Sequence, residues 1–388
     1  MGVIGGFSVG FITTLLLVTQ AYSPPVTSHS YLKVKHKQMK LRPLRYQDIP
    51  NWQRDDHLAA YQAFKVSCIG HLQKGAKKTP LNQKRKHLCQ LAIRATITHK
   101  QQAKQFFQTH FRPYRVLTAR SLLTGYYEPE LEGSRTKTAD YTIPVYRRPA
   151  DLVSLIRDKD RAAKNHQLTF MRRKAGKLEP YPTRQQIEQG ALEGQGLELI
   201  YLKDQVDAFF MHIQGSARIK LPDGSVIRIG YDGKNGHPYR SIGKHLQKAY
   251  KFSGHQLRLE AVKSWLRNNK ETGQKVMWHN KSYIFFRELN NNESANGPIG
   301  AEGVSLTAKR SLAVDGSYHQ LGLPIWLDVP SLTHHGARGF HHLMIGQDVG
   351  SAIKGPARGD IFWGSGEEAG KLAGGTKHKG RFTILLPR

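Results

Sequence analysis

The sequence predicts a mainly β protein that is preceded by a short α-helical N-terminal segment. Three observations support this. Apolar residues recur at three- and four-residue steps between residues 55 and 112, which is typical of helices. From Val116 onward, short β-prone runs alternate with Gly and Pro, and the last third of the chain is rich in such runs. Many short strands spaced by glycine are typical of a small barrel.

The composition indicates a globular protein with an extreme charge. Hydrophobic residues make up 39% and charged residues 23% of the 388 residues, which excludes a disordered chain and allows two domains. The chain has 59 Lys and Arg against 29 Asp and Glu, a formal net charge of +30. Such a field favours a polyanionic partner, and the composition leaves open nucleic acid, acidic lipid or an acidic polymer of the cell envelope.

Residues 1–23 are typical of a signal peptide or an N-terminal anchor. The apolar core, from Phe7 to Val18, is short for a membrane span and suits a secretory segment, although no Lys or Arg precedes it. No cysteine follows this core, so we do not expect a lipoprotein. We expect export to the periplasm or cell envelope, through a cleaved signal or with an uncleaved anchor.

The next two segments are predicted from their composition and periodicity. Residues 24–54 have the prolines and basic residues of a linker, and residues 55–112 form a basic helical segment. Cys68 and Cys89 lie in the first two helical patterns of that segment. A disulfide between adjacent helices suits an exported protein, and two buried thiols are the alternative.

The chain from His57 to Tyr127 contains no Asp or Glu and has thirteen Lys or Arg, among them Lys84, Arg85 and Lys86. Two interpretations explain this pattern equally well: a solvated basic face of a helix, or a surface that binds a polyanion. Our hypothesis is an electrostatic tether to the anionic cell wall or to acidic lipid.

The sequence of the middle of the chain predicts both short strands and short helices. "LLTGYYEPELEGS" and "YTIPVYRRP" predict strands. Thr183 is expected to cap a helix, with Gln186 completing a capping box. "DQVDAFFMHIQG" predicts a helix that ends at Gly215, and Asp223-Gly224 predicts a hairpin turn. "YRSIGKHLQKAYK" and "RLEAVKSWLRNN" predict amphipathic helices.

The C-terminal third predicts six strands, each bounded by glycine or other turn residues. Their sequences are "SYIFFREL", "SLAVDGSY", "PIWLDVPS", "HHLMIGQDVG", "GDIFWG" and "RFTILLP".

Several common functional motifs are absent or weak. His334, His335, His341 and His342 cluster in sequence, but adjacent residues of a strand point to opposite faces, so we expect no metal site. The chain has no P-loop and no G-x-S-x-G elbow. Basic residues near Tyr114, Tyr126 and Tyr127 are not part of a nucleic-acid-binding motif, so no nucleic-acid partner is expected.

Asp360 is the strongest candidate for chemistry. It lies between "GPARG" and the apolar "IFWG", and an aromatic, apolar setting raises the pKa of a carboxyl group. A carboxylic acid that stays protonated near neutral pH is what a general acid for glycosidic cleavage requires. An isolated aspartate at such a position is otherwise more often a turn residue.

Six blocks together resemble the membrane-bound lytic transglycosylase A (MltA-type) family of murein-cleaving enzymes. They are "LLTGYYEPELEGS", "YPTRQQIEQGAL", "DAFFMHIQGSARIKLPDGS", "GYDGKNGHPYRSIG", "SLAVDGSYHQLGLPIWLD" and "QDVGSAIKGPARGDIFWGSG". The C-terminal part is similar to the three-aspartate domain, whose aspartates fall on Asp315, Asp348 and Asp360. Val349 and Ser351 stand where this family often has Thr and Gly.

The resemblance implies a double-psi β-barrel with a second β-rich domain inserted into it, and a groove between the two for a glycan strand. The first part of the barrel is expected at residues 113–135, the inserted substrate domain at 136–280 and the C-terminal barrel part at 281–388. Asp360 is the expected catalytic residue, supported by Asp348 and Asp315. The expected sugar contacts are Thr124, Tyr127, Gln214, Ser216 and Lys354.

The implied reaction needs one carboxyl group and no metal or other cofactor. The C6 hydroxyl of N-acetylmuramic acid attacks its own ring, so a 1,6-anhydro product forms without water. Peptidoglycan glycan strands are the expected substrate. The alternative is a non-catalytic envelope protein that binds peptidoglycan or another polyanion on the same fold.

Overall fold

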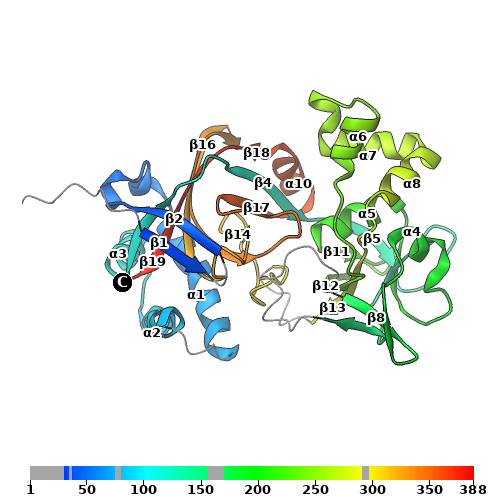
Figure 1. Ribbon diagram of the computed structural model, residues 1–388, viewed down its shortest axis with the longest axis horizontal. Coiled ribbons are helices and arrows are strands. Elements are labelled where there is room, and N and C mark those ends of the chain that lie inside the picture. The colour runs from blue at the N-terminus through cyan, green and yellow to red at the C-terminus, as the bar shows by residue number, and fades with distance from the viewer. Residues whose placement is uncertain (1–29, 35–36, 75–79, 156–169, 291–296, 335) are drawn as a thin grey trace, which may run out of the picture.

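The computed structural model describes residues 30–34, 37–74, 80–155, 170–290, 297–334 and 336–388. The predicted signal or anchor at 1–23, and His335, lie outside these residues. Within them the chain forms two lobes that lie side by side (Figure 1). No helix in the described ranges is long and apolar enough to cross a membrane.

The first lobe is built on a ten-stranded mixed sheet. Its strand order is β1-β2-β3-β19-β15-β16-β14-β17-β4-β18, with parallel pairing between β14 and β16 and between β17 and β4. The strands are β1 (Ser30–Val34), β2 (Lys37–Pro43), β3 (Phe111–Val116), β4 (Leu122–Glu128), β14 (Ser311–Val314), β15 (Pro324–His334), β16 (Ala337–Asp348), β17 (Arg358–Ser365), β18 (Lys377–His378) and β19 (Arg381–Pro387). Helix α10 (Gly366–Gly375) packs on β4 and β17.

The mainly β fold is confirmed, and so are all six strands predicted in the C-terminal third. The first-lobe core contains Leu123, Leu327, Phe340, Ile361 and Phe382, each nearly inaccessible to solvent. The double-psi topology remains a prediction.

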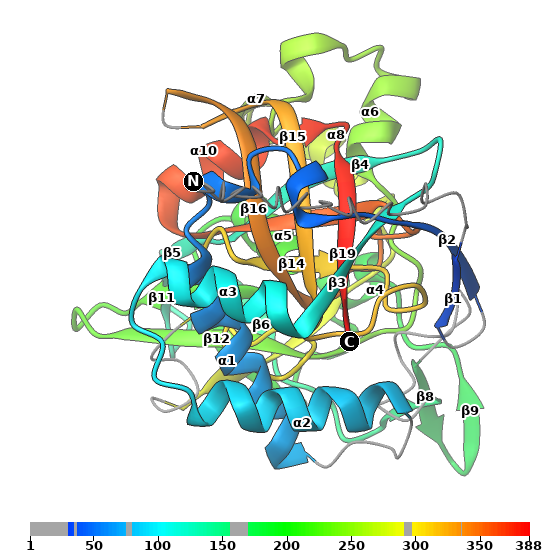
Figure 2. The same ribbon diagram turned by 90° about the vertical axis from the view of Figure 1, so that its left-hand side faces the viewer.

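Three helices cover one face of this sheet: α1 (His57–Lys74), α2 (Pro80–Arg94) and α3 (Lys100–His110). They lie together on the side of the molecule that faces the viewer in Figure 2. Phe64 and Phe107 pack with Trp326 of β15 and Leu343 of β16, so the helices share a core with the sheet. A disulfide joins Cys68 of α1 to Cys89 of α2.

The prediction of a linker at residues 24–54 is wrong for its second half. This half contains β2 and the short 3-10 helices η1 (Tyr46–Asp48) and η2 (Trp52–Arg54). Met39 and Leu41 are buried, whereas Lys40 is exposed. This alternation is that of a half-buried strand, and the basic residues and prolines concealed it. Trp52 is also buried, against Trp326.

The second lobe contains a six-stranded sheet of order β13-β12-β11-β5-β10-β6 and a small sheet, β7-β8-β9. A bridge between Arg147, after β6, and Phe286 of β13 brings the two edges of the larger sheet together. The strands are β5 (Glu130–Ser134), β6 (Ile143–Tyr146), β7 (Leu152–Ser154), β8 (Phe170–Lys174), β9 (Lys177–Glu179), β10 (Glu198–Leu202), β11 (Ser216–Lys220), β12 (Val226–Lys234) and β13 (Ile284–Leu289).

Helices surround this sheet at the far end of the molecule. They are α4 (Arg184–Gln186) with the π-helical turn η4 (Ile187–Ala191), α5 (Gln205–Gln214), α6 (Ile242–Ala249), η5 (Gly254–Leu257), α7 (Leu259–Asn268) and α8 (Lys270–Trp278). The capping box of Thr183 and Gln186, the helix that ends at Gly215, the hairpin at Asp223-Gly224 and both amphipathic helices are confirmed.

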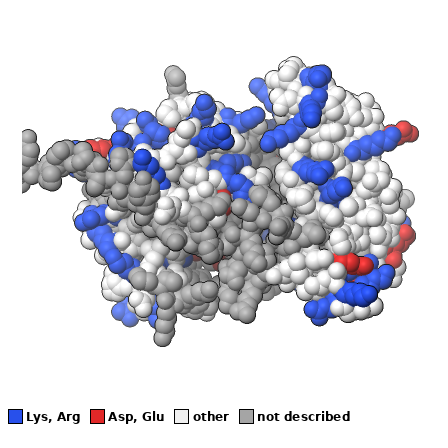
Figure 3. Space-filling view, in the orientation of Figure 1, with Lys and Arg blue, Asp and Glu red and all other residues white. Residues whose placement is uncertain are grey.

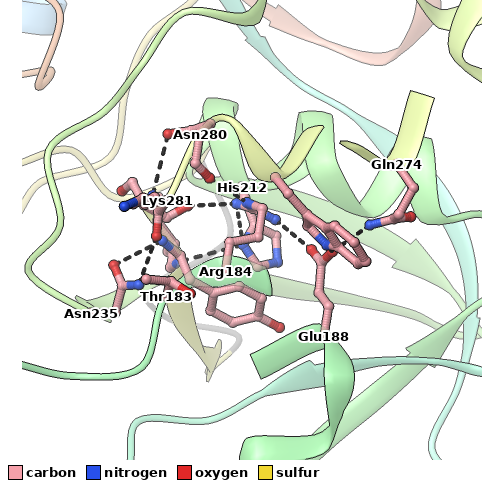
Figure 4. Close-up of polar contacts among 12 residues, drawn as sticks. Thr183, Arg184, Glu188, His212, Asn235, Gln274, Asn280 and Lys281 are labelled. Atoms are coloured by element: carbon pink, nitrogen blue, oxygen red, sulfur yellow. Dashed lines mark hydrogen bonds and ion pairs between the residues drawn. The ribbon is translucent and has the colours of Figure 1, made fainter. Parts of the chain in front are cut away.

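A buried arginine holds part of this lobe together (Figure 4). Arg184 is 1% exposed and donates hydrogen bonds to the carbonyl oxygens of Asn280 and Ser282 and to the carboxylate of Glu188. The other oxygen of Glu188 accepts from Gln274 and from the Trp278 indole. All donors and acceptors of this network come from the second lobe, so we assign it to stability.

The domain boundaries differ from those predicted. The chain enters the second lobe between Glu128, the last residue of β4, and Glu130, the first of β5. It returns after β13, which pairs with β12, and not at residue 281. Glu128 lies at the first crossing, where its buried carboxylate accepts from Arg228 of the second lobe and from Ser365 of the first.

Candidate active site

The candidate site lies on β16, β14, β17 and β4 of the first lobe, of which β17 and β4 lie towards the second lobe in Figure 1. The sheet register places Asp348 of β16 and Asp360 of β17 on either side of Ala313 of β14. Thr124 of β4 is the next residue in the row, beside Asp360. Residues in register share a face of a sheet, so these side chains lie on one surface.

Asp360 is partly buried and has one hydrogen-bond donor among the described residues. The hydroxyl of Thr124 donates to Oδ1, and the Arg358 guanidinium donates to that hydroxyl at 2.8 Å. Since the Thr124 oxygen accepts from Arg358, its proton is directed at Asp360. Burial raises the pKa of Asp360 above its usual value, and the Thr124 hydrogen bond and the Arg358 charge offset this only in part. Asp360 therefore has the environment of a proton donor.

Asp348 has a different environment. Its Oδ1 accepts from the backbone N–H groups of Ala301 at 2.8 Å and Val349 at 2.9 Å, and its Oδ2 accepts from the Tyr126 hydroxyl at 3.0 Å. Burial raises the pKa of Asp348 to about 6, with these three donors opposing the rise and the charge of Asp360 adding to it. Three donors on two oxygens are what an ionised carboxylate requires.

Asp315 holds the loop that leads to Asp360. The carboxylate is buried and accepts from the backbone N–H of Gly355 at 2.8 Å and from the hydroxyl of Ser317 at 2.7 Å. Burial acts to raise the pKa of Asp315, but these hydrogen bonds outweigh it and the pKa is lowered. The side chain thus fixes the turn before β17.

The predicted sugar contacts occupy different environments. Thr124 contacts Asp360, and Lys354 is exposed in the loop before β17. Gln214 ends α5 in the second lobe and accepts from the backbone N–H of Tyr127 at 3.1 Å, so it connects the lobes. Ser216 begins β11 beside it and is partly buried.

Tyr127 is poorly placed for a sugar contact. Its side chain is 6% exposed and packs in the first-lobe core against Gly370 of α10. Alternation along β4 explains this, because Thr124 and Tyr126 share one face and Tyr127 points to the other. The same alternation would have identified Tyr126, which contacts Asp348 and which sequence reasoning missed.

Two further residues of the site were not predicted. Arg358 lies two positions before Asp360, as a side chain on the same face of β17 would, but no motif singled it out. Tyr239 follows Pro238 in the quoted block "GYDGKNGHPYRSIG". The charge of Asp360 contributes to the raised pKa of Tyr239, although burial is the larger cause, so this second-lobe phenol lies near the aspartate.

The histidines of β16 bind separate aspartates. His341 contacts Asp328 at 2.8 Å, and His342 contacts Asp55 at 2.7 Å, on opposite faces of the strand. Asp55 is buried and also receives two hydrogen bonds from Arg310 at 3.0 Å. In the described part of the chain, no group of three or more His, Cys, Asp or Glu is arranged to hold a metal ion.

Comparisons with known proteins agree with this architecture. The family model described as the MltA specific insert domain matches residues 122–287, and the 3D domain model matches residues 310–386. A membrane-bound lytic murein transglycosylase from Agrobacterium tumefaciens has a similar structure, with a TM-score of 0.81 and 38% identity over 90% of this chain and 98% of that one. MltA from Neisseria gonorrhoeae gives a TM-score of 0.75 and 36% identity, over 90% and 93%.

A curated relative shows similarity over a shorter range. The membrane-bound lytic murein transglycosylase A of Vibrio cholerae is 34% identical over 266 residues, which cover 67% of this chain and 64% of the relative. The chain thus spans slightly less than two thirds of that relative's length.

Proposed function

The chain belongs to the MltA family of lytic murein transglycosylases, and from this membership and the geometry of Asp360 we propose that it is a peptidoglycan lytic transglycosylase. It cleaves the β-1,4 bond between N-acetylmuramic acid and N-acetylglucosamine. The products carry 1,6-anhydromuramic acid ends. The proposed setting is the periplasm or cell envelope, and the proposed substrate site lies between the two lobes.

In the proposed reaction Asp360 acts as both acid and base. Protonated Asp360 gives its proton to the glycosidic oxygen as the bond from muramic C1 to that oxygen breaks. The C6 hydroxyl then attacks C1, and the Asp360 carboxylate takes the hydroxyl proton as the new bond from O6 to C1 forms. Because the nucleophile is tethered to the reacting ring, little orientational entropy is lost in the reaction. Water is neither consumed nor released.

The hydrogen bonds of Asp348 are the main observation in support of a mechanism in which Asp360 is the only carboxyl group that takes part in the chemistry. Hydrolases that use two carboxylates need the second as nucleophile or as base toward water. Both oxygens of Asp348 already accept hydrogen bonds, from two backbone groups and from Tyr126. This carboxylate is a poor nucleophile, and its negative charge favours the protonated form of Asp360.

The other predicted contacts are proposed from their positions. Gln214 and Ser216 are second-lobe residues near the end of β4, where the chain passes between the lobes. Lys354 is exposed on the first lobe, in the loop before β17. We add Tyr239, whose phenol lies near Asp360 and whose ring can pack on a sugar face.

The test is digestion of purified sacculi by wild-type protein and by Asp360→Asn, with the products identified by mass spectrometry. The wild type should release 1,6-anhydro-muropeptides without reducing muramic ends. Asparagine is nearly isosteric but carries no exchangeable acid proton, so the rate should fall by at least about 10²–10⁴-fold. Reducing ends would show that water is the nucleophile, and sacculus binding without any cleavage by wild type would favour a non-catalytic binding protein.

A further inference from the structure

The α1–α2 helix pair lies outside both matched family regions, yet it reaches the candidate site through the loop before β14. Ser67 of α1 and Arg85 of α2 converge on one carboxylate, that of Glu302. The Ser67 hydroxyl donates to Oε2 at 2.6 Å, and the Arg85 guanidinium donates to Oε1 at 2.5 Å. All three side chains are buried, with the Arg85 and Glu302 side chains 5% and 8% exposed.

Glu302 follows the residue that holds Asp348. The backbone N–H of Ala301 donates to Asp348, and the backbone N–H of Glu302 donates to the carbonyl oxygen of Gln347 at 3.0 Å. The loop and the end of β16 are therefore joined at two consecutive residues. The hydrogen bond from Ala301 ends on the Asp348 carboxyl group, and the one from Glu302 ends on the backbone of the preceding residue, Gln347.

Gln347 strengthens the same connection. Its side chain donates to the Ser67 hydroxyl at 2.9 Å and to the carbonyl oxygen of Ala63, both on α1. Successive residues of a strand point to opposite faces, so Gln347 faces the helices while Asp348 faces the site. The helix pair thus contacts the end of β16 on the face opposite to the one that carries Asp348.

Two glycines leave the space that this contact needs. A Cβ on Gly322, whose φ is +82°, would lie 1.8 Å from an Arg85 nitrogen and 2.3 Å from Oε1 of Glu302. A Cβ on Gly70 of α1 would lie 2.3 Å from the side chain of Val304, in the same loop. The helix and the loop therefore pack in direct contact.

We propose that Glu302 is a positioning residue of the active site: held between Ser67 and Arg85, it fixes Ala301 so that the Ala301 N–H keeps the Asp348 carboxylate in place. The proposal rests on the proposed function, because it assigns support to the same reaction. It also gives the N-terminal helix pair a part in catalysis, through the contacts of Ser67 and Arg85 with Glu302.

The test compares Glu302→Ala with the conservative Glu302→Gln. The ¹³C signal of the Asp348 carboxyl, assigned by its loss in Asp348→Asn, is followed by NMR against pH. Alanine releases the loop, and with a weaker Ala301 hydrogen bond the pKa of Asp348 should rise from about 6 by on the order of one unit. Glutamine keeps an oxygen for Arg85 and an amide for Ser67, so the pKa should stay near that of wild type.

Activity gives a second readout. In Glu302→Ala, kcat on soluble glycan near pH 6 should fall roughly tenfold with little change in KM, because Asp348 is no longer held in place beside Asp360. Asp55→Asn is the matched control. It disturbs another buried ion pair between the N-terminal segment and the sheet without touching residues 301–302 or 347–348, so it should lower the unfolding temperature and leave kcat near that of wild type.

An unchanged Asp348 pKa in a folded Glu302→Ala protein would overturn the proposal, and so would the same shift in Asp55→Asn. If Glu302→Ala does not fold, Ser67→Ala replaces it and should give a smaller shift in the same direction, with no shift counting against the proposal. The NMR titration needs no activity. Absence of anhydro products from wild type would therefore refute the proposed function while leaving this result to stand.

Discussion

Asp348 and Asp360 are separated in role by their hydrogen-bond donors. From the residues that the structure describes, Asp348 receives three donors and Asp360 receives one, from Thr124. Donors stabilise the charged form and fix its orientation, but burial is the larger cause for both groups and raises the pKa of each. The three donors hold the Asp348 carboxyl in one orientation. Asp360 keeps one oxygen without a donor among the described residues, as a group that exchanges a proton with the substrate requires.

The raised pKa of Asp348 predicts a decrease in stability with pH. Between the ordinary value of 3.8 and about 6, the folded chain keeps a proton on Asp348 that the unfolded chain has lost. The free energy of unfolding should therefore fall by about 2 kcal/mol as pH rises from about 4 to 7. Asp348→Asn should remove most of this slope. Thermal unfolding of wild type and of Asp348→Asn at each pH measures it, and the difference between the two slopes is the contribution of Asp348.

The same variant separates charge from position. An asparagine at 348 can accept from Ala301 and Val349 and donate to the Tyr126 oxygen, so the geometry is kept while the charge is lost. In an otherwise wild-type protein, the alkaline limb of kcat should then move to lower pH, because Asp360 loses its proton more easily. An unchanged alkaline limb would mean that Asp348 acts through geometry alone.

At the level of elements, the sequence predicts strands well where they are bounded by glycine and rich in β-branched or aromatic residues, as in "GDIFWG" and "RFTILLP". It predicts less where composition and periodicity disagree. Residues 37–43 have the charge of a linker and the alternation of a strand. Helix α10 contains Gly370, which is unfavourable in a helix but leaves room for the ring of Tyr127, so tertiary packing decides its structure.

The candidate site was predictable only in part. Asp360 and Asp348 are close in sequence, and the family resemblance identifies them. Ala301 and Glu302 lie in a loop without regular structure, more than 40 residues before Asp348, and only the pairing of β14 with β16 brings the two segments together. Arg85 was assigned to a basic surface because it lies between two lysines. A helix places neighbouring residues on different faces, and Arg85 faces inward.

The disulfide between α1 and α2 should contribute to stability. It closes a loop of about 21 residues, and cross-links of this size stabilise a fold by about 3 kcal/mol. Cys68→Ala combined with Cys89→Ala should lower the unfolding temperature by several degrees, and reductant should do the same to wild type. Calorimetry with and without reductant measures both. The double variant has no cysteine, so a further decrease on adding reductant would mean that the reductant lowers stability by a route other than cleavage of the disulfide.

At the scale of the whole molecule, the charge of +30 is spread over both lobes. Figure 3 shows Lys and Arg on each lobe, with few acidic side chains on that face. The hypothesis of a tether in the segment 57–127 needs one correction. Arg85 is buried in an ion pair with Glu302, so it is not part of a surface that binds polyanions. Lys84 and Lys86 on either side of it are exposed and keep that role in the proposal.

The tether predicts that binding to the cell wall depends on these two lysines and on salt. Each exposed cation near an anionic surface contributes about 1 kcal/mol, and this attraction is screened beyond about 8 Å at physiological ionic strength. In the inactive Asp360→Asn background, Lys84→Glu with Lys86→Glu should weaken sacculus binding at low salt by roughly tenfold or more. High salt should abolish the difference. Sedimentation of sacculi with bound protein measures it.

The matched control makes the same charge change on the second lobe. Lys174→Glu with Lys177→Glu reverses two exposed lysines of the β8–β9 hairpin, far from α2 in Figure 1. If net charge alone drives binding, both pairs of reversals should weaken it equally, which would contradict a tether on α2. In the active protein, the Lys84 and Lys86 reversals should leave cleavage of short soluble glycans unchanged, because Glu302 is held by Ser67 and Arg85 and not by these two lysines. Loss of that cleavage would place this helix surface within the catalytic groove.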